Sequence, residues 1–349
     1  MLTTESKSTP RCFIVGAGAS CDAGYPLVDN FVISLDGWVN KAAAAEFNED
    51  DRLRLDLYKD ELQPVIESAK AEMGKSDRDN IERLLEKLRK SNSQAYLLFE
   101  KIIYWMFFHF AGHGEVYDSG YFKEFFSKTR PGDCIISFNY DLLLEWALRD
   151  SGIQYTYNWS DTRKVRILKP HGAINFITNL DENSDVRVKH LDGNVSKHKA
   201  RQVFTRLSEY FGCNIGHGVW DIFNNKLGIS HFYWDQFNIK GKQSFLILPE
   251  LNKDDVLKRS DYQFLKLTWE HIPDVLISFH ELWVIGYNFS ESDKKAVDTI
   301  GTYLKNTNRR VYVIDPEPKS PYLKELCAKS HVKHFALKFK KFLASEKSI

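Results

Sequence analysis

Short runs of apolar and β-branched residues recur along the chain, and most are followed by turn residues and then by helical spacing. They lie at Cys12 to Val15, Cys134 to Phe138, Phe245 to Leu248, Leu282 to Ile285 and Val311 to Ile314. Such runs suit strands of a parallel sheet that is buried on both faces. Strands that alternate with helices imply right-handed crossovers. The sequence therefore predicts an α/β fold with a Rossmann-like open parallel sheet and helices on both faces.

Two stretches interrupt this alternation within what we interpret as a single domain over residues 1–349. Residues 35–128 predict a mainly helical insertion, because Asp79 and Glu82 resemble a capping pair ahead of apolar positions at helical spacing. These positions are Ile81, Leu84, Leu85 and Leu88. Residues 180–241 show no sustained period, so the structure of this second insertion stays open. Near the C-terminal end, His334 to Leu343 mixes apolar residues with lysines and predicts a closing helix.

Composition and charge are those of a soluble globular protein. Hydrophobic residues make up 43% of the 349 residues and charged residues 27%. The 48 Lys and Arg residues nearly balance the 47 Asp and Glu residues, so no general attraction to nucleic acid or membrane is expected. The basic stretch from Lys189 to Arg206 leaves direct contact with nucleic acid open, although a solvated loop is the favoured interpretation.

Neither a disulfide framework nor a metal site is expected. The five cysteines are scattered singly, which argues against a cysteine-based zinc module and so against a zinc ribbon. His109 and His113 have the spacing of a helical metal pair but lack the intervening acid of such motifs. The longest uncharged apolar run, Ile102 to Phe108, is too short to span a bilayer, and the first ten residues are polar. A cytoplasmic location is therefore predicted.

A glycine-rich turn follows the first predicted strand directly, at Gly16-Ala17-Gly18-Ala19-Ser20. Glycines there let the main chain turn sharply and direct N–H groups at a pyrophosphate. Cys21 replaces the last glycine of the dinucleotide-binding pattern, and no clear acidic residue closes a second strand about twenty residues later. The dehydrogenase version is thus disfavoured. A glycine turn that joins strand to helix without any ligand is the alternative, and the motif alone does not decide between the two.

Polar residues follow two further predicted strands, in Ser137-Phe138-Asn139-Tyr140-Asp141 and in Lys169-Pro170-His171-Gly172. Open α/β sheets bind ligands at the carboxyl edge of their strands. Taken singly, Asn139 or Asp141 can simply cap the next helix, and an isolated histidine is more often structural than catalytic. Their joint order after the glycine turn makes Asn139, His171 and Asp141 the candidate catalytic residues.

The ordered set of motifs resembles the sirtuin-like superfamily, and within it the bacterial antiphage-defence branch. The set comprises Gly16 to Ser20, Gly24-Tyr25-Pro26, Phe138-Asn139-Tyr140-Asp141, His171-Gly172 and Gly286-Tyr287-Asn288-Phe289 to Asp293. It also includes Asp79-Asn80-Ile81-Glu82, Leu246-Ile247-Leu248-Pro249, and Trp269 upstream of the strand that ends at Gly286. Each motif is short, but together they cover most of the chain in a fairly specific order.

This resemblance implies NAD⁺ as the substrate and a set of binding residues. The turn formed by Gly16, Ala17, Gly18, Ala19 and Ser20 would cradle the phosphates, with Gly24 and Pro26 in the adjoining turn. Gly286, Asn288 and Asp315 would lie near the adenosine half. Asn139, Asp141 and His171 would surround the nicotinamide ribose. An amide can hold a water or a ribose hydroxyl, and a histidine with an ordinary pKa of about 6.5 can accept a proton near neutrality.

The sequence departs from the family's protein deacylases, and this changes the expected acceptor of the ADP-ribosyl group. Those enzymes carry a four-cysteine zinc module and an Asp-Phe-Arg sequence after the Gly-x-Pro turn, whereas here Pro26 is followed by Leu27-Val28-Asp29. Water then becomes the expected acceptor, so the predicted reaction is hydrolysis of NAD⁺ to nicotinamide and ADP-ribose. An NAD-dependent deacylase and a catalytically silent scaffold that binds NAD⁺ or ADP-ribose remain the alternatives.

The defence branch also implies a biological role and partners. Its members deplete NAD⁺ in infected cells, together with a separately encoded protein such as a HerA-like ATPase or a short Argonaute, and they form homo-oligomers. No residue pattern in the chain identifies an interface or an activating signal.

Overall fold

The structure is a computed structural model that describes residues 9–44, 59–60, 63–72, 81–91, 120–178, 217–219, 244–246 and 263–346. It also describes the single residues 96, 99, 103, 106 and 107. The predicted second insertion, the basic stretch from Lys189 to Arg206, and the pair His109 and His113 fall outside these residues, apart from 217–219.

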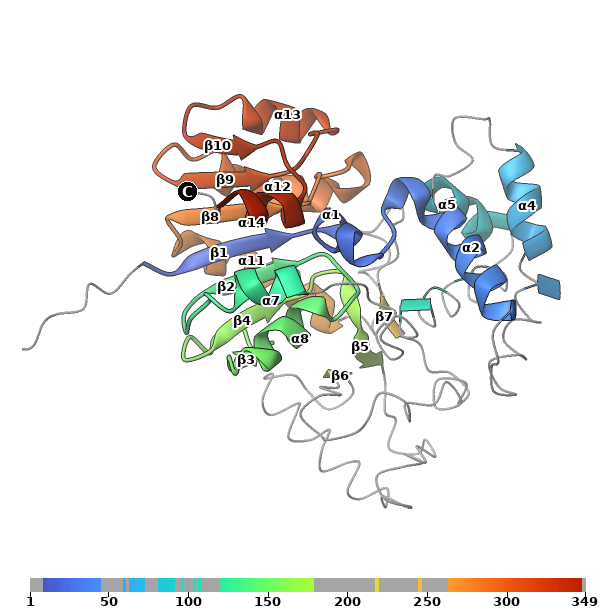
Figure 1. Ribbon diagram of the computed structural model, residues 1–349, viewed down its shortest axis with the longest axis horizontal. Coiled ribbons are helices and arrows are strands. Elements are labelled where there is room, and N and C mark those ends of the chain that lie inside the picture. Colours follow the sequence, from blue (N-terminus) through green and yellow to red (C-terminus); the bar gives the residue numbers. More distant parts are fainter. Residues whose placement is uncertain are drawn as a thin grey trace, which may run out of the picture.

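The described residues form a seven-stranded sheet in which every pairing is parallel, with strand order β10-β9-β8-β1-β2-β4-β3 (Figure 1). The strands are β1 (Arg11–Val15), β2 (Cys134–Ser137), β3 (Tyr155–Thr156), β4 (Val165–Leu168), β8 (Glu281–Ile285), β9 (Arg310–Ile314) and β10 (Val332–Phe335). The central strands are almost entirely buried, because helices cover the sheet on both faces. The predicted α/β, Rossmann-like fold is confirmed.

Two groups of helices enclose this sheet (Figure 1). One face carries α7 (Gly120–Phe126), α8 (Leu143–Asp150) and α14 (Phe339–Glu346), and the other carries α11 (Gln263–Ile277) and α12 (Lys294–Leu304). Phe13 on β1 packs edge-on against Phe126 of α7, at 5.8 Å between ring centroids, and α14 adds Phe339 to the same cluster. Burying one such side chain contributes about 2–3 kcal/mol. The helix α13 (Pro321–Cys327) follows β9 and contacts β10.

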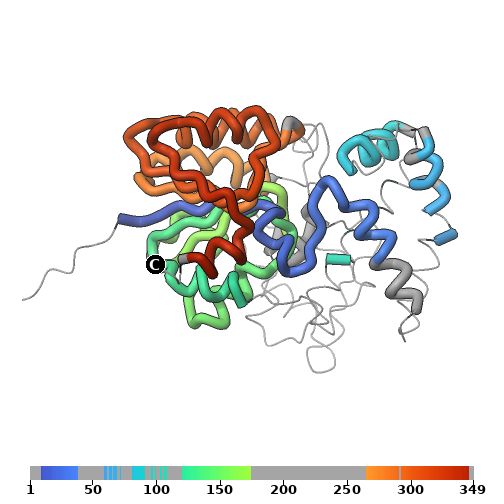
Figure 2. Tube along the Cα trace, turned by 45° about the horizontal axis from the view of Figure 1, so that its top comes forward, coloured from blue at the N-terminus to red at the C-terminus, as the bar shows by residue number. Residues whose placement is uncertain are grey.

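Helices inserted between β1 and β2 gather beyond the carboxyl ends of the strands (Figures 1 and 2). They include α2 (Phe31–Ala44), α4 (Gln63–Glu72) and α5 (Ile81–Ser91). The helical pattern predicted for α5 is confirmed, because its apolar positions Ile81, Leu84, Leu85 and Leu88 are all buried. By contrast α7, which also lies inside the interval 35–128, packs on the sheet as part of the core.

Two predictions of local structure were wrong. The run from Phe245 to Leu248 was expected to join the parallel sheet, but β7 (Ser244–Leu246) pairs antiparallel with β5 (Gly172–Thr178). Together with β6 (His217–Val219) these strands form a separate three-stranded sheet among the described residues. The segment from His334 to Leu343 is also not one helix, since β10 ends at Phe335 and α14 begins at Phe339. Short apolar runs reveal burial but not the partner strand.

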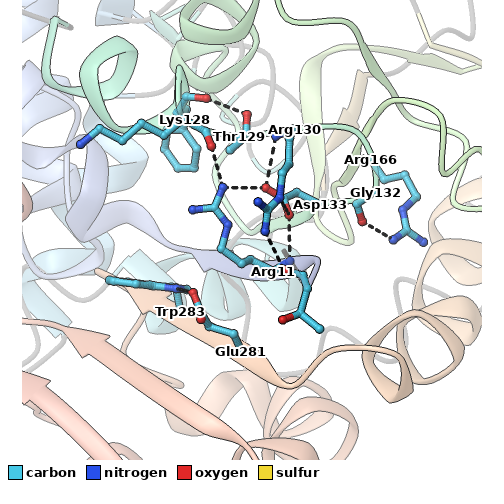
Figure 3. Close-up of polar contacts among 11 residues, drawn as sticks. Arg11, Lys128, Thr129, Arg130, Gly132, Asp133, Arg166, Glu281 and Trp283 are labelled. Carbon is cyan, nitrogen blue, oxygen red and sulfur yellow. Dashed lines mark hydrogen bonds and ion pairs between the residues drawn. The ribbon is translucent and has the colours of Figure 1, made fainter. Parts of the chain in front are cut away.

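A network of charged side chains closes the amino edge of the sheet (Figure 3). Asp133, just before β2, has a fully buried carboxylate that accepts hydrogen bonds from the main-chain N–H and the guanidinium of Arg11, each at 2.8 Å. The main-chain N–H of Arg130 donates to the same carboxylate, and Arg166 on β4 donates to the carbonyl of Gly132. These bonds join the N-terminal ends of β1, β2 and β4. In the described part of the chain, no helix is long and apolar enough to cross a membrane.

Candidate functional site

The candidate residues follow the carboxyl ends of five parallel strands. The chain fills one side of the sheet with β2, β4 and β3 before it crosses to β8, so the order reverses between β1 and β8. Open α/β sheets bind ligands in the crevice at such a reversal. The glycine turn follows β1, Asn139 follows β2, His171 follows β4, Gly286 follows β8 and Asp315 follows β9. The structure therefore brings the predicted motifs to one edge.

The glycine turn after β1 packs main chain to main chain against the turn after β8. Gly16 N–H donates to Ile285 O at 3.0 Å, and Gly18 N–H donates to Gly286 O at 2.9 Å. A Cβ atom on Gly286 would lie 2.2 Å from Ala19 N, and one on Gly16 would lie 2.6 Å from Gly286 O. Gly286 also has a φ of 58°, in the left-handed region that favours glycine. This close approach requires the glycines whether or not a ligand is present.

The same contacts limit which N–H groups of this turn can reach a phosphate. Gly16 and Gly18 donate across to the β8 turn, and Ala19 N–H donates to Gly16 O at 2.9 Å. Ala17 is the first residue of the short helix α1 (Ala17–Ser20), a position whose N–H has no acceptor within its helix. A phosphate at this turn would therefore meet fewer donors than the motif suggests, with Ala17 the foremost.

Asn139 has its amide nitrogen fixed and its amide oxygen without a partner. Nδ2 donates to Gly16 O at 3.1 Å and to Ser20 Oγ at 2.9 Å. The side chain is almost fully buried, with 6% of the residue exposed, and Oδ1 has no hydrogen-bond partner in the part of the chain that the structure describes. Because a buried, unpaired acceptor is costly, it marks a position where a ligand or water can bind. Asn139 thus offers an acceptor alone, since both amide hydrogens are used.

Asp141 holds the glycine turn after β1 through Ser20. Its Oδ2 accepts a hydrogen bond of 2.8 Å from Ser20 Oγ, and its Oδ1 accepts one of 3.1 Å from Leu143 N–H at the start of α8. Asn139, Ser20 and Asp141 therefore form one chain of hydrogen bonds in which each hydroxyl or amide donates to the next acceptor. Burial raises the pKa of the Asp141 carboxyl above its ordinary value, and nearby Lys169 opposes this rise. The structure gives Asp141 a helix-capping and positioning role.

A buried ion pair anchors this polar chain. Lys169, at the end of β4, lies 2.9 Å from the carboxylate of Glu145 on α8, and both side chains are fully buried. Lys169 also donates to the carbonyl of Asp141 at 2.6 Å, and the Tyr157 hydroxyl donates to Glu145 at 3.0 Å. Burial raises the pKa of the Glu145 carboxyl, whereas the Lys169 ammonium lowers it. Charges buried this deeply persist only when paired.

His171 lies in a mainly aromatic environment next to one carboxylate. Its ring packs edge-on against Phe138, the neighbour of Asn139, at 4.9 Å, and lies 5.9 Å from the Trp269 ring. Its Nε2 atom is 3.3 Å from Oδ1 of Asp293, an ion-pair contact that is not aligned as a hydrogen bond. Only 4% of the residue is exposed. His171 thus contacts the segment that carries Asn139 through Phe138, and it contacts the start of α12 (Lys294–Leu304) through Asp293.

Two residues predicted to lie near the adenosine half of NAD⁺, Asn288 and Asp315, lie in the loops after β8 and β9. Asn288 Oδ1 accepts hydrogen bonds from Lys319 N–H at 2.9 Å and Ser320 N–H at 3.0 Å, so Asn288 holds the start of α13. Asp315 is buried at the end of β9, where its carboxylate accepts a bond of 2.9 Å from Glu317 N–H. Burial raises the pKa of the Asp315 carboxyl above its ordinary value.

Gly24 and Pro26 lie on the segment that leads from the glycine turn to the inserted helices. Gly24 has a φ of 94° and ends the 3-10 turn η1 (Cys21–Ala23), donating its N–H to Cys21 O at 3.0 Å. Pro26 is buried and precedes the turn η2 (Val28–Asn30) that leads into α2. Gly24 and Pro26 therefore shape the bend of this segment, and the turn η1 separates them from Ser20.

Sequence reasoning assigned no role to several residues that the structure places at the site. Asp293 ended a quoted motif, and Glu145 and Lys169 stood among apolar residues. The available signal was the apolar context: an acid on the face of Leu143, Leu144 and Leu148 and a lysine after the run of β4 must both be buried and therefore paired. The partner itself was not evident from the sequence.

Within the described residues, no group of three or more His, Cys, Asp or Glu side chains is arranged to hold a metal ion. Comparison with protein-family models and with curated proteins gives no match for this chain. The family resemblance therefore stays a prediction that rests on the motifs and on the edge of the sheet where they meet.

Proposed function

We propose that the protein is an NAD⁺ glycohydrolase of the sirtuin-like superfamily, which cleaves NAD⁺ to nicotinamide and ADP-ribose. The proposal joins the ordered motifs of the sequence with the edge at which their residues lie. A Rossmann-like sheet, a glycine turn at the reversal of strand order, and an amide and an imidazole at the next strand ends suit a dinucleotide substrate. A role in antiphage defence through NAD⁺ depletion belongs to the same proposal.

The amide oxygen of Asn139 is the observation that carries this proposal. Because Nδ2 is held by Gly16 O and Ser20 Oγ, the amide cannot exchange its two ends without breaking both bonds. Oδ1 is therefore presented as an acceptor of fixed orientation, in a position buried from solvent. A purely structural asparagine at this depth would be expected to satisfy its oxygen as well. A water or ribose hydroxyl that donates to Oδ1 would supply the missing bond.

Hydrolysis of NAD⁺ needs little protonation of its leaving group, because nicotinamide departs from a cationic ring as a neutral molecule. What the site must supply is an oriented water and a base. In the proposed reaction, Asn139 Oδ1 accepts a hydrogen bond from the water and His171 takes its other proton. The water oxygen bonds to the ribose carbon C1′, while the electron pair of the C1′–N bond moves to the nicotinamide nitrogen. The proton on His171 then passes to solvent.

The remaining predicted residues take supporting roles in this proposal. Ala17 N–H would contact the pyrophosphate at the first position of α1, and Gly16, Gly18 and Gly286 would allow the backbone to approach it. Asp315, buried at the end of β9, would lie on the adenosine side together with Asn288. Ser20 and Asp141 would act through Asn139 by fixing its amide.

The purified full-length chain tests the proposal directly when it is incubated with NAD⁺. We expect release of nicotinamide and ADP-ribose in equal amounts, independent of any added acyl-lysine peptide. Turnover that requires an acetylated peptide and yields an acetylated ADP-ribose would instead identify a deacylase. Binding of NAD⁺ or ADP-ribose without nicotinamide release would identify a silent binding module. The assay is run with and without candidate partners, a HerA-like ATPase or a short Argonaute, because the defence role implies activation by a second protein.

A further inference from the structure

Asp293 occupies a helix-capping position but does not cap its helix. It is the N-cap residue of α12, where an aspartate side chain ordinarily accepts a hydrogen bond from the first turn. Its side chain makes no such capping bond. Instead Oδ1 lies 3.3 Å from Nε2 of His171, and Oδ2 accepts a hydrogen bond of 2.9 Å from the Tyr287 hydroxyl. The carboxylate thus contacts the imidazole and the Tyr287 hydroxyl and does not cap α12.

The turn that carries Asp293 is braced by the inserted helix α5. The turn η8 (Glu291–Asp293) contains Ser292, whose hydroxyl lies 2.7 Å from that of Ser290. Ser292 also donates a hydrogen bond to the carboxylate of Glu82 on α5, and both residues are buried. Helix α5 is distant in sequence from this turn. The contact therefore fixes Asp293 from the helical insertion as well as from the sheet.

Aromatic packing fixes Tyr287 and His171, the two residues that contact the Asp293 carboxylate. The Tyr287 ring stacks on Phe138 at 4.1 Å and an interplanar angle of 4°, and Phe138 packs edge-on against His171. Burial, reinforced by the charge of Asp293, raises the pKa of the Tyr287 phenol well above its ordinary value. Tyr287 therefore stays protonated near neutral pH and remains a donor to the carboxylate.

We propose that Asp293 and Tyr287 are positioning residues for His171, and that the carboxylate keeps the proton of the neutral imidazole on Nε2. In a neutral imidazole one nitrogen donates and the other accepts, so Nδ1 then carries the lone pair that takes the proton from water. This inference rests on the proposed hydrolase activity. Once Nδ1 is protonated, both ring nitrogens carry hydrogens, and the carboxylate stabilises the cation until the proton passes to solvent. The 3.3 Å contact between Nε2 and Oδ1 is an ion-pair contact and is not aligned as a hydrogen bond, so the carboxylate acts on the Nε2–H group through its charge.

The test uses Asp293→Asn and Tyr287→Phe in the full-length chain, with Asp298→Asn and Tyr322→Phe as matched controls. Asp298 is exposed on α12, and the Tyr322 hydroxyl donates to Gly301 O and not to Asp293. We expect Asp293→Asn to lower kcat for nicotinamide release by at least about tenfold with KM nearly unchanged, and Tyr287→Phe to lower it by about threefold. Neither control should change kcat.

A second readout does not depend on turnover. Selective ¹⁵N labelling of histidine, with His171→Gln to assign the signal, reports which ring nitrogen of His171 carries the proton. We expect the proton on Nε2 in the wild-type protein and a shift of this population in Asp293→Asn. Wild-type kcat in Asp293→Asn, or a proton on Nδ1 in the wild-type protein, would overturn the inference. If the wild-type protein releases no nicotinamide at all, the proposed function fails, while the ¹⁵N signal still decides whether Asp293 positions His171.

Discussion

Charged side chains join the strands at the amino edge of the parallel sheet, whereas main-chain contacts between glycine turns join them at the carboxyl edge. At the amino edge, the buried carboxylate of Asp133 holds Arg11 and Arg130 (Figure 3). At the carboxyl edge, Gly16 and Gly18 donate directly to carbonyls of the turn after β8. Both oxygens of the Asp133 carboxylate are therefore used in holding the fold.

The difference explains how one sheet can support both stability and a reactive site. Where the main chain supplies the cohesion, a polar side chain can keep part of its hydrogen-bonding capacity for a ligand. Asn139 illustrates this at the carboxyl edge, because its Oδ1 is buried without a partner in the part of the chain that is described. Polar side chains at the two edges should accordingly respond differently to substitution, with stability lost when Asp133 is replaced and activity lost when Asn139 is replaced. The glycines at the carboxyl edge hold the fold, so replacing them should cost stability.

The largest loss of stability is expected where the glycine turns meet. Gly286→Ala would place a Cβ atom 2.2 Å from Ala19 N and force alanine to a φ of 58°. We expect it to lower the free energy of unfolding by about 3–5 kcal/mol, the sum of backbone strain and overpacking. Gly152→Ala is the matched control, because Gly152 has a φ of 70° but no neighbour within 4 Å of its Cβ position. It should cost only about 1–2 kcal/mol. Equal losses in urea unfolding would show that the turns are not interlocked.

At the amino edge, Asp133→Ala should cost less but should spare the chemistry. It removes the acceptor for two main-chain N–H groups and for the Arg11 guanidinium, which is only partly exposed. We expect a loss of about 2–3 kcal/mol in the free energy of unfolding, from unsatisfied donors and an unpaired charge. Asp150→Ala, which removes an exposed partner of Arg149, should change stability by less than about 0.5 kcal/mol. A loss of turnover per folded Asp133→Ala molecule would contradict the separation of the two edges.

The smallest effect is a pH dependence at the carboxyl edge. Burial raises the pKa of Asp315 in the folded protein above its ordinary value of about 4. The folded state then binds this proton more tightly than the unfolded chain, so the contribution is present at low pH and is lost as pH rises through the raised pKa. Asp315→Asn should flatten this part of the stability profile, measured as the urea midpoint against pH. The exposed Asp298→Asn is the control, and parallel profiles for wild type and Asp315→Asn would contradict the assignment.

Much of the fold followed from the sequence, because its signals are local. The β-branched runs identified β1, β2, β8 and β9, and the spacing of Ile81, Leu84, Leu85 and Leu88 identified α5. The prediction for β7 was wrong because an apolar run does not reveal which strand it pairs with. The prediction of one closing helix was wrong because Val332 to Phe335 add an edge strand to β9 instead.

The sequence predicted that the candidate residues would lie at one edge of the sheet, but it did not predict their contacts. Strand ends placed Asn139 and His171 at one edge, as the parallel topology requires. The partners of Asn139 Nδ2 and the turn of Asp293 away from its helix depend on segments far apart in sequence. The pairing of Glu145 with Lys169 is of the same kind, since each charge alone looked like an exception in an apolar stretch. Such contacts are set by the packing of elements, and one sequence does not encode them locally.

Nicotinamide release by Asn139→Ala and His171→Ala, compared with wild type at equal concentrations of folded protein, tests the central claim most directly. Circular dichroism and urea unfolding first establish that each variant is folded. We predict that the wild-type chain hydrolyses NAD⁺ and that either substitution lowers the rate by about 10²–10⁴, since it removes the acceptor for the water or the base. Unchanged release of nicotinamide by both folded variants would contradict the account.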